Sequence, residues 1–266
     1  MYCKMKRFCQ KLYLGIVMLF LYAPIFVLIV LSFNRSKSRS KWGGFTTKWY
    51  SSMFSDDTIW IALRDTLVIA VLSALIATLL GTLAAIGINR MRKLPRSIIL
   101  GITNIPMLNA EIVTGISLML LFLATGLELG FVTVLLSHVA FNVPYVILSV
   151  MPKLQQTNRS TYEAALDLGA TPAKAFFLVV LPDIFPGVLS GFLLAFTLSL
   201  DDFIITHFTR GASVNTLSTL IYSETRKGIK PEMYALSTLL FVSVFILLII
   251  VNRAGAKQEK KKAALS

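Results

Sequence analysis

The sequence is poor in the residues on which metal proteins and disulfide-bonded domains depend. Its 266 residues include two cysteines and two histidines. Both cysteines, Cys3 and Cys9, lie in a basic N-terminal segment, and two neighbouring thiols can form neither a disulfide framework nor a four-ligand metal site. We therefore expect no disulfide and no bound metal.

Motifs of enzymes are also missing. The sequence has no G-x-x-x-x-G-K-[ST] loop to hold a nucleotide, no H-E-x-x-H and no G-x-S-x-G. We expect a chain that is not an enzyme, has no catalytic residues and binds no cofactor of its own.

Charged residues make up 15% of the chain, and acids are the scarcer kind. There are 26 Lys and Arg against 13 Asp and Glu, which gives a net charge of +13. The basic residues cluster between apolar runs and form no stripe interleaved with aromatics, so we exclude nucleic acid as a partner.

Hydrophobic residues, in contrast, make up 56% of the sequence, and the mean hydropathy is +0.74. Several apolar runs reach the roughly 20 residues that cross a hydrocarbon core about 30 Å thick. We predict an all-α integral membrane protein in the lipid bilayer, a single domain over residues 1–266. Its six expected spans are Leu12–Phe33, Thr66–Asn89, Ile98–Thr125, Phe131–Met151, Ile184–Phe208 and Tyr234–Val251.

The ends of the chain indicate its orientation. Residues 1–11 are basic like the start of a signal peptide, but the apolar stretch that follows is too long for one and has no cleavage site. Residues 12–252 then form the membrane domain, and 253–266 form a basic tail. Lys and Arg favour a cytoplasmic location for both termini, although the basic run from Arg35 to Lys41 opposes this orientation.

Prolines lie within or at the ends of four spans, where each removes a backbone hydrogen bond. Either broken helices surround a path, or neighbouring helices absorb the kinks. The four are Pro24, Pro106, Pro144 and Pro186.

The segment 152–183, between the fourth and fifth spans, carries the most specific pattern, which runs from Ser160 to Pro182. We predict that Ser160 is the N-cap of a short helix and that Glu163 completes a capping box. Gly169 stands where this helix requires a left-handed residue. Thr171 then caps a second short helix, which Pro182 closes before the fifth span.

This hairpin is too short and too polar to span a membrane. Its apolar side chains mark a docking surface or else pack back on the bundle, and the sequence leaves both interpretations open. They are Ala164, Ala165, Leu168, Phe176, Phe177 and Val180.

Acidic residues inside the apolar spans need a reason, because each costs about 2.5–3.5 kcal/mol at the centre of a helix. Ser199, Asp201 and Asp202 lie in the fifth span and Glu111 in the third. At 1.5 Å per residue, Asp201 lies roughly 25 Å and Glu111 about 20 Å from the cytoplasmic starts of their spans. The acids can therefore converge, and without histidine ligands they favour an organic cation as substrate.

Simpler interpretations of these residues also stand. The acids can pair with Arg64, Arg210 or His207, or cap helix ends. Interhelical hydrogen bonds explain His138. Three aromatics of the first loop can stack on an ammonium group or sit at the membrane interface: Trp42, Trp49 and Tyr50.

The hairpin resembles the EAA motif of ABC importer permeases. The matching residues are Glu163, Ala164, Ala165, Gly169, Leu181 and Pro182, with Val179 in place of a usual isoleucine. The resemblance implies a MetI-like permease fold in a bacterial cell membrane, with this loop as the cytoplasmic element that couples to an ATPase. It also implies as partners two ATPase copies that bind ATP and Mg²⁺, a homologous sister permease and an extracytoplasmic binding protein.

A closer resemblance, to spermidine/putrescine permease subunits, rests on residues 22–34, 44–53 and 196–208. It implies that Trp49, Ser199 and the three acids handle polyamine. Glu111 departs from the family, which more often has proline and aspartate in this stretch. The remaining alternatives are an ABC importer permease for another solute, and a stand-alone channel or secondary transporter.

Overall fold

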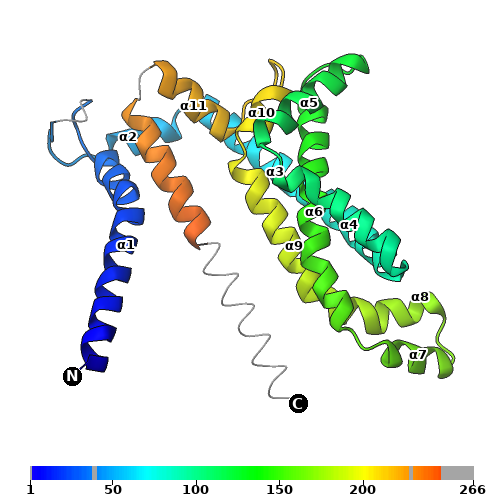
Figure 1. Cartoon of the computed structure of the whole chain (residues 1–266). Helices are drawn as coiled ribbons and strands as arrows, with labels where there is room; N and C mark the ends of the chain where they lie inside the picture. Colours follow the sequence, from blue (N-terminus) through cyan, green and yellow to red (C-terminus); the bar gives the residue numbers. More distant parts are fainter. Residues whose placement is uncertain (1, 38–40, 228–229, 247–266) are drawn as a thin grey trace. The chain divides into compact units, whose positions relative to one another are not determined.

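The computed structural model describes residues 2–37, 41–227 and 230–246. The regular secondary structure of the described residues is helical, apart from one isolated β-bridge between Asn34 and Phe45. It divides into two compact units, the first formed by residues 1–59 and 221–266 and the second by residues 60–220. Figure 1 labels the helices.

The first unit contains α1 (Tyr2–Ser32), α2 (Lys48–Phe54) and an apolar helix, Pro231–Ile246. The chain between α1 and α2 is organised by Asn34. The Asn34 amide donates to the Lys41 carbonyl at 2.9 Å and its oxygen accepts from the Gly43 amide at 2.8 Å. The indole of Trp49 donates to the Asn34 carbonyl at 2.7 Å, which anchors α2 to the end of α1.

The second unit holds most of α3 and all of the helices up to α10. The bounds are α3 (Asp57–Arg90), α4 (Lys93–Leu108), α5 (Glu111–Ala124), α6 (Phe131–Gln156), α7 (Arg159–Asp167), α8 (Pro172–Ala175), a π-helical turn (Phe176–Val180), α9 (Leu181–Asp201) and α10 (Ile204–Thr209), followed by the start of α11 (Leu217–Lys227).

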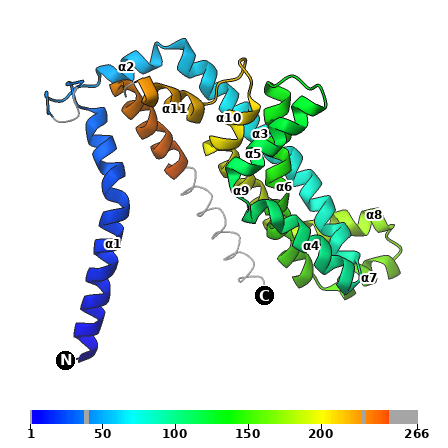
Figure 2. The ribbon, with the colours of Figure 1, turned by 45° about the horizontal axis from the view of Figure 1, so that its top comes forward.

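The core of the second unit is the contact between α6 and α9, which lie side by side in Figures 1 and 2. Glycines allow this close approach. A Cβ on Gly187 would lie 3.0 Å from the Ser149 carbonyl oxygen, and one on Gly191 would lie 3.3 Å from the Val146 Cα. The two backbones therefore meet where side chains are absent, as is common between helices in membranes.

The expected third span, Ile98–Thr125, is not one straight helix. It breaks at Asn109 and Ala110, which are extended, and the axes of α4 and α5 differ by 102°. Pro106 has already removed a hydrogen bond from the last turn of α4. The estimate of 20 Å for Glu111 assumed a straight helix, whereas Glu111 begins the second helix of the bent pair.

The expected fifth span, Ile184–Phe208, is wrong at both ends. A continuous apolar helix runs from Pro172 to Asp201, so Pro182 does not separate the hairpin from the span. A π-helical turn that ends at Val180, two residues before Pro182, widens the backbone near the position where proline supplies no amide. At the other end the helix stops at Asp201, and α10 begins three residues later at Ile204.

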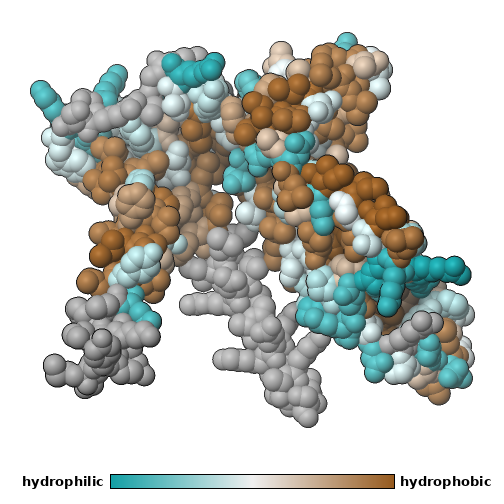
Figure 3. Space-filling view, viewed as in Figure 1, coloured by the Kyte–Doolittle hydropathy of each residue, from teal (hydrophilic) through white to brown (hydrophobic). Residues whose placement is uncertain are grey.

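Four described helices are long and apolar enough to cross a membrane, or five if the bent pair α4–α5 counts as one span. They contain Gln10–Ser32, Asp57–Arg90, Phe131–Gln156 and Pro172–Asp201. Figure 3 shows hydrophobic side chains along α4, on a surface that has to face lipid or another protein. Residues 247–251 of the expected sixth span and the basic tail lie outside the described residues.

Candidate functional site

Three acids line one pocket in the second unit, with a volume of about 420 Å³. They are Glu111, Asp201 and Asp202, and the aromatic residues Phe141 and Tyr145 of α6 share the wall. The expectation that the acids converge is confirmed, although two broken helices bring them together and not two straight ones. Breaks in membrane helices are tolerated where they line a cavity.

The helix ends set the electrostatics of this pocket. Glu111 is the first residue of α5, where the helix dipole is positive and partly offsets its charge. Asp201 is the last residue of α9, where the unpaired carbonyls add to the negative charge of the carboxylate. Both side chains are exposed. The pocket is therefore most negative near Asp201, and it favours a cation.

Asp202 differs from its neighbour because its side chain is engaged. Its Oδ2 accepts hydrogen bonds from the Thr206 amide at 2.8 Å and from the Thr206 hydroxyl at 2.7 Å. Its Oδ1 accepts from the Ile205 amide at 3.3 Å. Asp202 thus caps α10, and this was one of the simpler interpretations of the acids.

His138 of α6 completes the surroundings of Asp202. The imidazole Nε2 lies 3.4 Å from Asp202 Oδ2 and 2.9 Å from the Thr206 hydroxyl oxygen, and Nδ1 lies 3.0 Å from Ser199 Oγ. The histidine is 1% exposed. Interhelical hydrogen bonding, the role expected of His138, is confirmed.

Ser199 and Trp49 do not line this pocket. Ser199 is buried, and its hydroxyl accepts from the Asn142 amide at 2.7 Å and lies 2.9 Å from Ser73 Oγ. Trp49 belongs to the first unit, where it is buried and bound to Asn34. Their roles in handling substrate stay predictions.

Sequence reasoning missed Asn142, Ser73 and Thr206. A polar residue inside an apolar span was the signal for each, as it was for His138. Asn142 is fully buried, and its Oδ1 has no hydrogen-bond partner among the described residues. Such a buried, unpaired acceptor is uncommon and favours a polar guest or an internal water.

The hairpin has the predicted shape with a different first cap. Asn158, and not Ser160, is the N-cap of α7, and its Oδ1 accepts from the Ser160 amide at 3.0 Å. The expected Ser160–Glu163 capping box is therefore wrong, because the N-cap lies two residues earlier and the helix begins at Arg159. Asn and Ser cap equally well, and the capping-box pattern favoured Ser160 although Asn158 is the cap.

The second half of the hairpin agrees with the sequence. Gly169 has φ +83°, and the Ala170 amide bonds the Ala165 carbonyl at 3.1 Å, as at a left-handed helix end. The Thr171 hydroxyl accepts from the Lys174 amide at 3.4 Å with Pro172 at the first helical position. Gly169 and Thr171 therefore have the expected roles.

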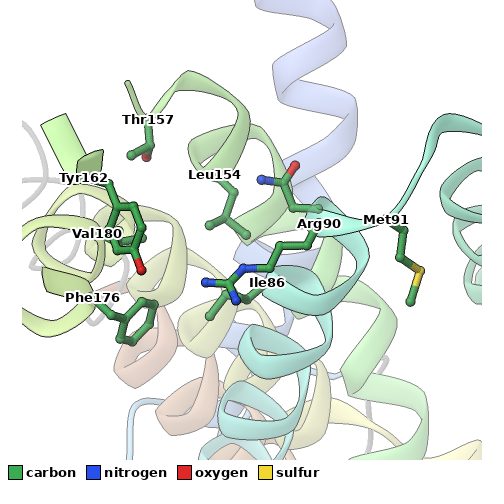
Figure 4. A pocket seen from close by; sticks show the side chains of 9 residues that line it. Ile86, Arg90, Met91, Leu154, Thr157, Tyr162, Phe176 and Val180 are labelled. Atoms are coloured by element: carbon green, nitrogen blue, oxygen red, sulfur yellow. The ribbon is translucent and has the colours of Figure 1, made fainter. Parts of the chain in front are cut away.

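The hairpin leaves its expected docking residues on the surface. Leu168 is 89% and Phe177 62% exposed, while Glu163 and Ala164 are also exposed and Ala165 and Leu181 are half-buried. A pocket of about 670 Å³ lies between the hairpin and the ends of α3 and α6. In Figure 4 the Arg90 side chain extends into it toward Tyr162 and Phe176.

The comparisons with known proteins define the class. Residues 77–262 match the family described as "Binding-protein-dependent transport system inner membrane component", and the chain belongs to this family. In fold, it resembles a bacterial ABC transporter involved in the import of alginate, with a TM-score of 0.72, 17% identity and coverage of 96% of this chain and 98% of that one. The methionine ABC transporter MetNI also matches, with a TM-score of 0.60 and coverage of 76% and 96%.

Curated relatives are more similar in sequence. The putrescine transport system permease protein PotI of Escherichia coli is 40% identical, with 91% of this chain and 89% of PotI covered. The spermidine/putrescine transport system permease protein PotC of the same organism is 38% identical, with 91% of each chain covered. The chain is thus a homologue of polyamine permease subunits of ABC transporters.

Proposed function

We propose that the chain is the permease subunit of an ATP-driven ABC importer and forms part of the translocation path for polyamines such as putrescine and spermidine. The observation that carries the proposal is the pocket lined by Glu111, Asp201 and Asp202. It occurs in a homologue of permeases whose names specify putrescine and spermidine.

The charge of the pocket supports a cationic substrate. A carboxylate and an ammonium group about 4 Å apart attract each other by about 4 kcal/mol at an effective dielectric constant of 20, and an anion is repelled to a similar extent. Phe141 and Tyr145 add aromatic faces on which an ammonium group or its methylene chain can rest. An importer for another solute is the alternative, and an anion fits this pocket poorly.

In this proposal the subunit crosses a bacterial inner membrane six times. The spans are α1, α3, the bent pair α4–α5, α6, the helix Pro172–Asp201 and a last span that includes Pro231–Ile246. Both termini and the hairpin lie on the cytoplasmic side, and the acid pocket lies toward the outside. The family description as an inner membrane component supports the location.

The hairpin is the proposed contact with the ATPase. Glu163, Ala164, Ala165, Gly169, Leu181 and Pro182 form the EAA loop, and the exposed Leu168 and Phe177 supply apolar area for docking. ATP and Mg²⁺ bind to two ATPase copies. A homologous permease completes the path, and an extracytoplasmic binding protein delivers the polyamine. One structural neighbour is an alginate transporter in complex with a periplasmic protein.

Uptake of radiolabelled putrescine and spermidine tests this function. The chain is expressed with its partner subunits in cells that lack polyamine importers, as wild type and as Glu163→Ala. We expect ATP-dependent uptake by the wild type, competition by unlabelled polyamines but not by anions, and loss of uptake in Glu163→Ala at equal expression. Uptake that persists without ATP contradicts an ABC importer, and an assembled wild type that transports no polyamine contradicts the substrate.

A further inference from the structure

The two neighbouring acids of the pocket have different surroundings. Asp201 is exposed, whereas the side chain of Asp202 is 5% exposed and that of His138 is 1% exposed. All the hydrogen bonds described for the Asp202 carboxylate come from the chain itself, namely from the first turn of α10. A bound cation can therefore reach the Asp201 carboxylate directly, whereas the Asp202 oxygens already accept hydrogen bonds from α10.

The protons of the buried network can be assigned from its connections. The Thr206 hydroxyl donates to Asp202 Oδ2, so its oxygen accepts from His138 Nε2–H. In the neutral imidazole Nδ1 is then an acceptor, and the Ser199 hydroxyl donates to it. Asn142 in turn donates to Ser199. Each proton in this chain of contacts has an acceptor, which makes the network rigid.

This network fixes the break between α9 and α10. Asp202 is extended, with φ −58° and ψ 127°, and its carboxylate caps α10 while its backbone carbonyl accepts from the Ser218 hydroxyl at 2.7 Å. His138 connects the capped acid to α6, the helix packed along α9. The position of Asp201, one residue before the break, therefore depends on the Asp202–His138 contact.

We propose that His138 is a positioning residue: through Asp202 and Thr206 it holds the helix break in the geometry that presents Asp201, together with Glu111, to the ammonium groups of the substrate. Asp202 is then part of the support and not a substrate ligand. This inference rests on the proposed function and assigns different roles to the two neighbouring acids.

The test uses the complete transporter in proteoliposomes, with His138→Ala and His138→Gln, which keeps a donor near Thr206 and Asp202. We expect His138→Ala to raise the KM for putrescine about tenfold or more, as small displacements of binding groups do, with Vmax per assembled transporter nearly unchanged. His138→Gln restores the KM to within about threefold of wild type, since the contact to Asp202 is kept. An unchanged KM in His138→Ala overturns the proposal.

A second readout does not depend on polyamine transport. Hydrogen exchange of the peptide covering residues 203–209 reports the Thr206 amide that Asp202 holds. We expect faster exchange in His138→Ala, wild-type exchange in His138→Gln, and no change in Glu128→Gln, which alters an exposed side chain outside the peptide and the pocket. Unchanged exchange in His138→Ala shows that the contact does not hold the break. If the wild type transports no polyamine, the proposed function fails, and this exchange still decides whether the support exists.

Discussion

The hairpin and the acid pocket belong to the same unit but are held in different ways. The hairpin is built from local contacts. The hydrogen bonds at Asn158, Gly169 and Thr171 all join residues at most five positions apart in the chain. The pocket is built from distant ones, since His138 contacts Ser199 and Thr206, which are 61 and 68 residues further along the chain. The hairpin exposes apolar side chains, whereas the pocket exposes carboxylates.

This difference fits two kinds of partner. When a protein covers the apolar surface of the hairpin, burial stabilises the complex by about 25 cal/mol per Å² of apolar area. The pocket carries two exposed acids on a rigid polar network, and it binds a small cation through charge attraction. One region is thus expected to move with a protein partner, and the other to hold its geometry while a substrate passes.

The largest expected effect separates two glycines with positive φ. Gly211, with φ +59°, follows the C-terminal end of α10 in the unit that holds the pocket, and a Cβ there overlaps the carbonyl of Leu129. Gly169 has φ +83° and open space around it. Gly169→Ala should cost about 1–2 kcal/mol of strain, and Gly211→Ala that amount plus about 1–3 kcal/mol for overlap. Thermal unfolding of the purified subunit in detergent measures both, and equal losses contradict the comparison.

A smaller effect is expected on binding to the ATPase. Leu168→Gln removes an apolar side chain that is 89% exposed on the hairpin, and its burial in a partner is worth about 1.5–3 kcal/mol, or about 10- to 100-fold in affinity. The thermal stability of the subunit should not change. Leu127→Gln, at a half-exposed position between α5 and α6, is the control and should leave the ATPase affinity unaltered. Equal affinities of all three proteins argue against docking at the hairpin.

Glu111 tests the pocket with a single charge. Glu111→Gln keeps the size of the side chain and removes its charge, so the KM for putrescine should rise about tenfold, the lower end for a hydrogen bond to a charged group. Glu128→Gln alters an exposed acid outside the pocket and should leave KM unchanged. If both variants behave alike, the effect comes from net charge and not from the pocket.

The smallest effect distinguishes the two candidate caps of α7. Asn158→Ala removes the observed cap and should cost about 1 kcal/mol of local stability. Ser160→Ala should cost less, because Ser160 accepts no cap bond from the helix and donates to Asn158 at 2.8 Å. Hydrogen exchange of residues 159–167 measures both, and a larger effect of Ser160→Ala restores the capping box predicted from the sequence.

The sequence predicted the features that depend on residues close together in the chain. The left-handed Gly169, the cap at Thr171 and most apolar spans follow from residue type and spacing. It did not predict the break at Asn109, because neither Asn109 nor Ala110 is a strong helix breaker and Pro106 is tolerated within α4. It also did not identify His138 as the neighbour of Asp202, because only the fold brings these two residues together.

The roles in substrate transport of Trp49, Ser199 and the acids stay predictions, and Asp201 tests them most directly. We would measure ATP-driven putrescine uptake by the reconstituted transporter as wild type, Asp201→Asn and Asp183→Asn, which alters the exposed acid in the first turn of the same helix. The account predicts a KM raised about 10- to 100-fold in Asp201→Asn and an unchanged KM in Asp183→Asn. A wild-type KM in a fully assembled Asp201→Asn transporter would contradict the assignment of this pocket to the polyamine path.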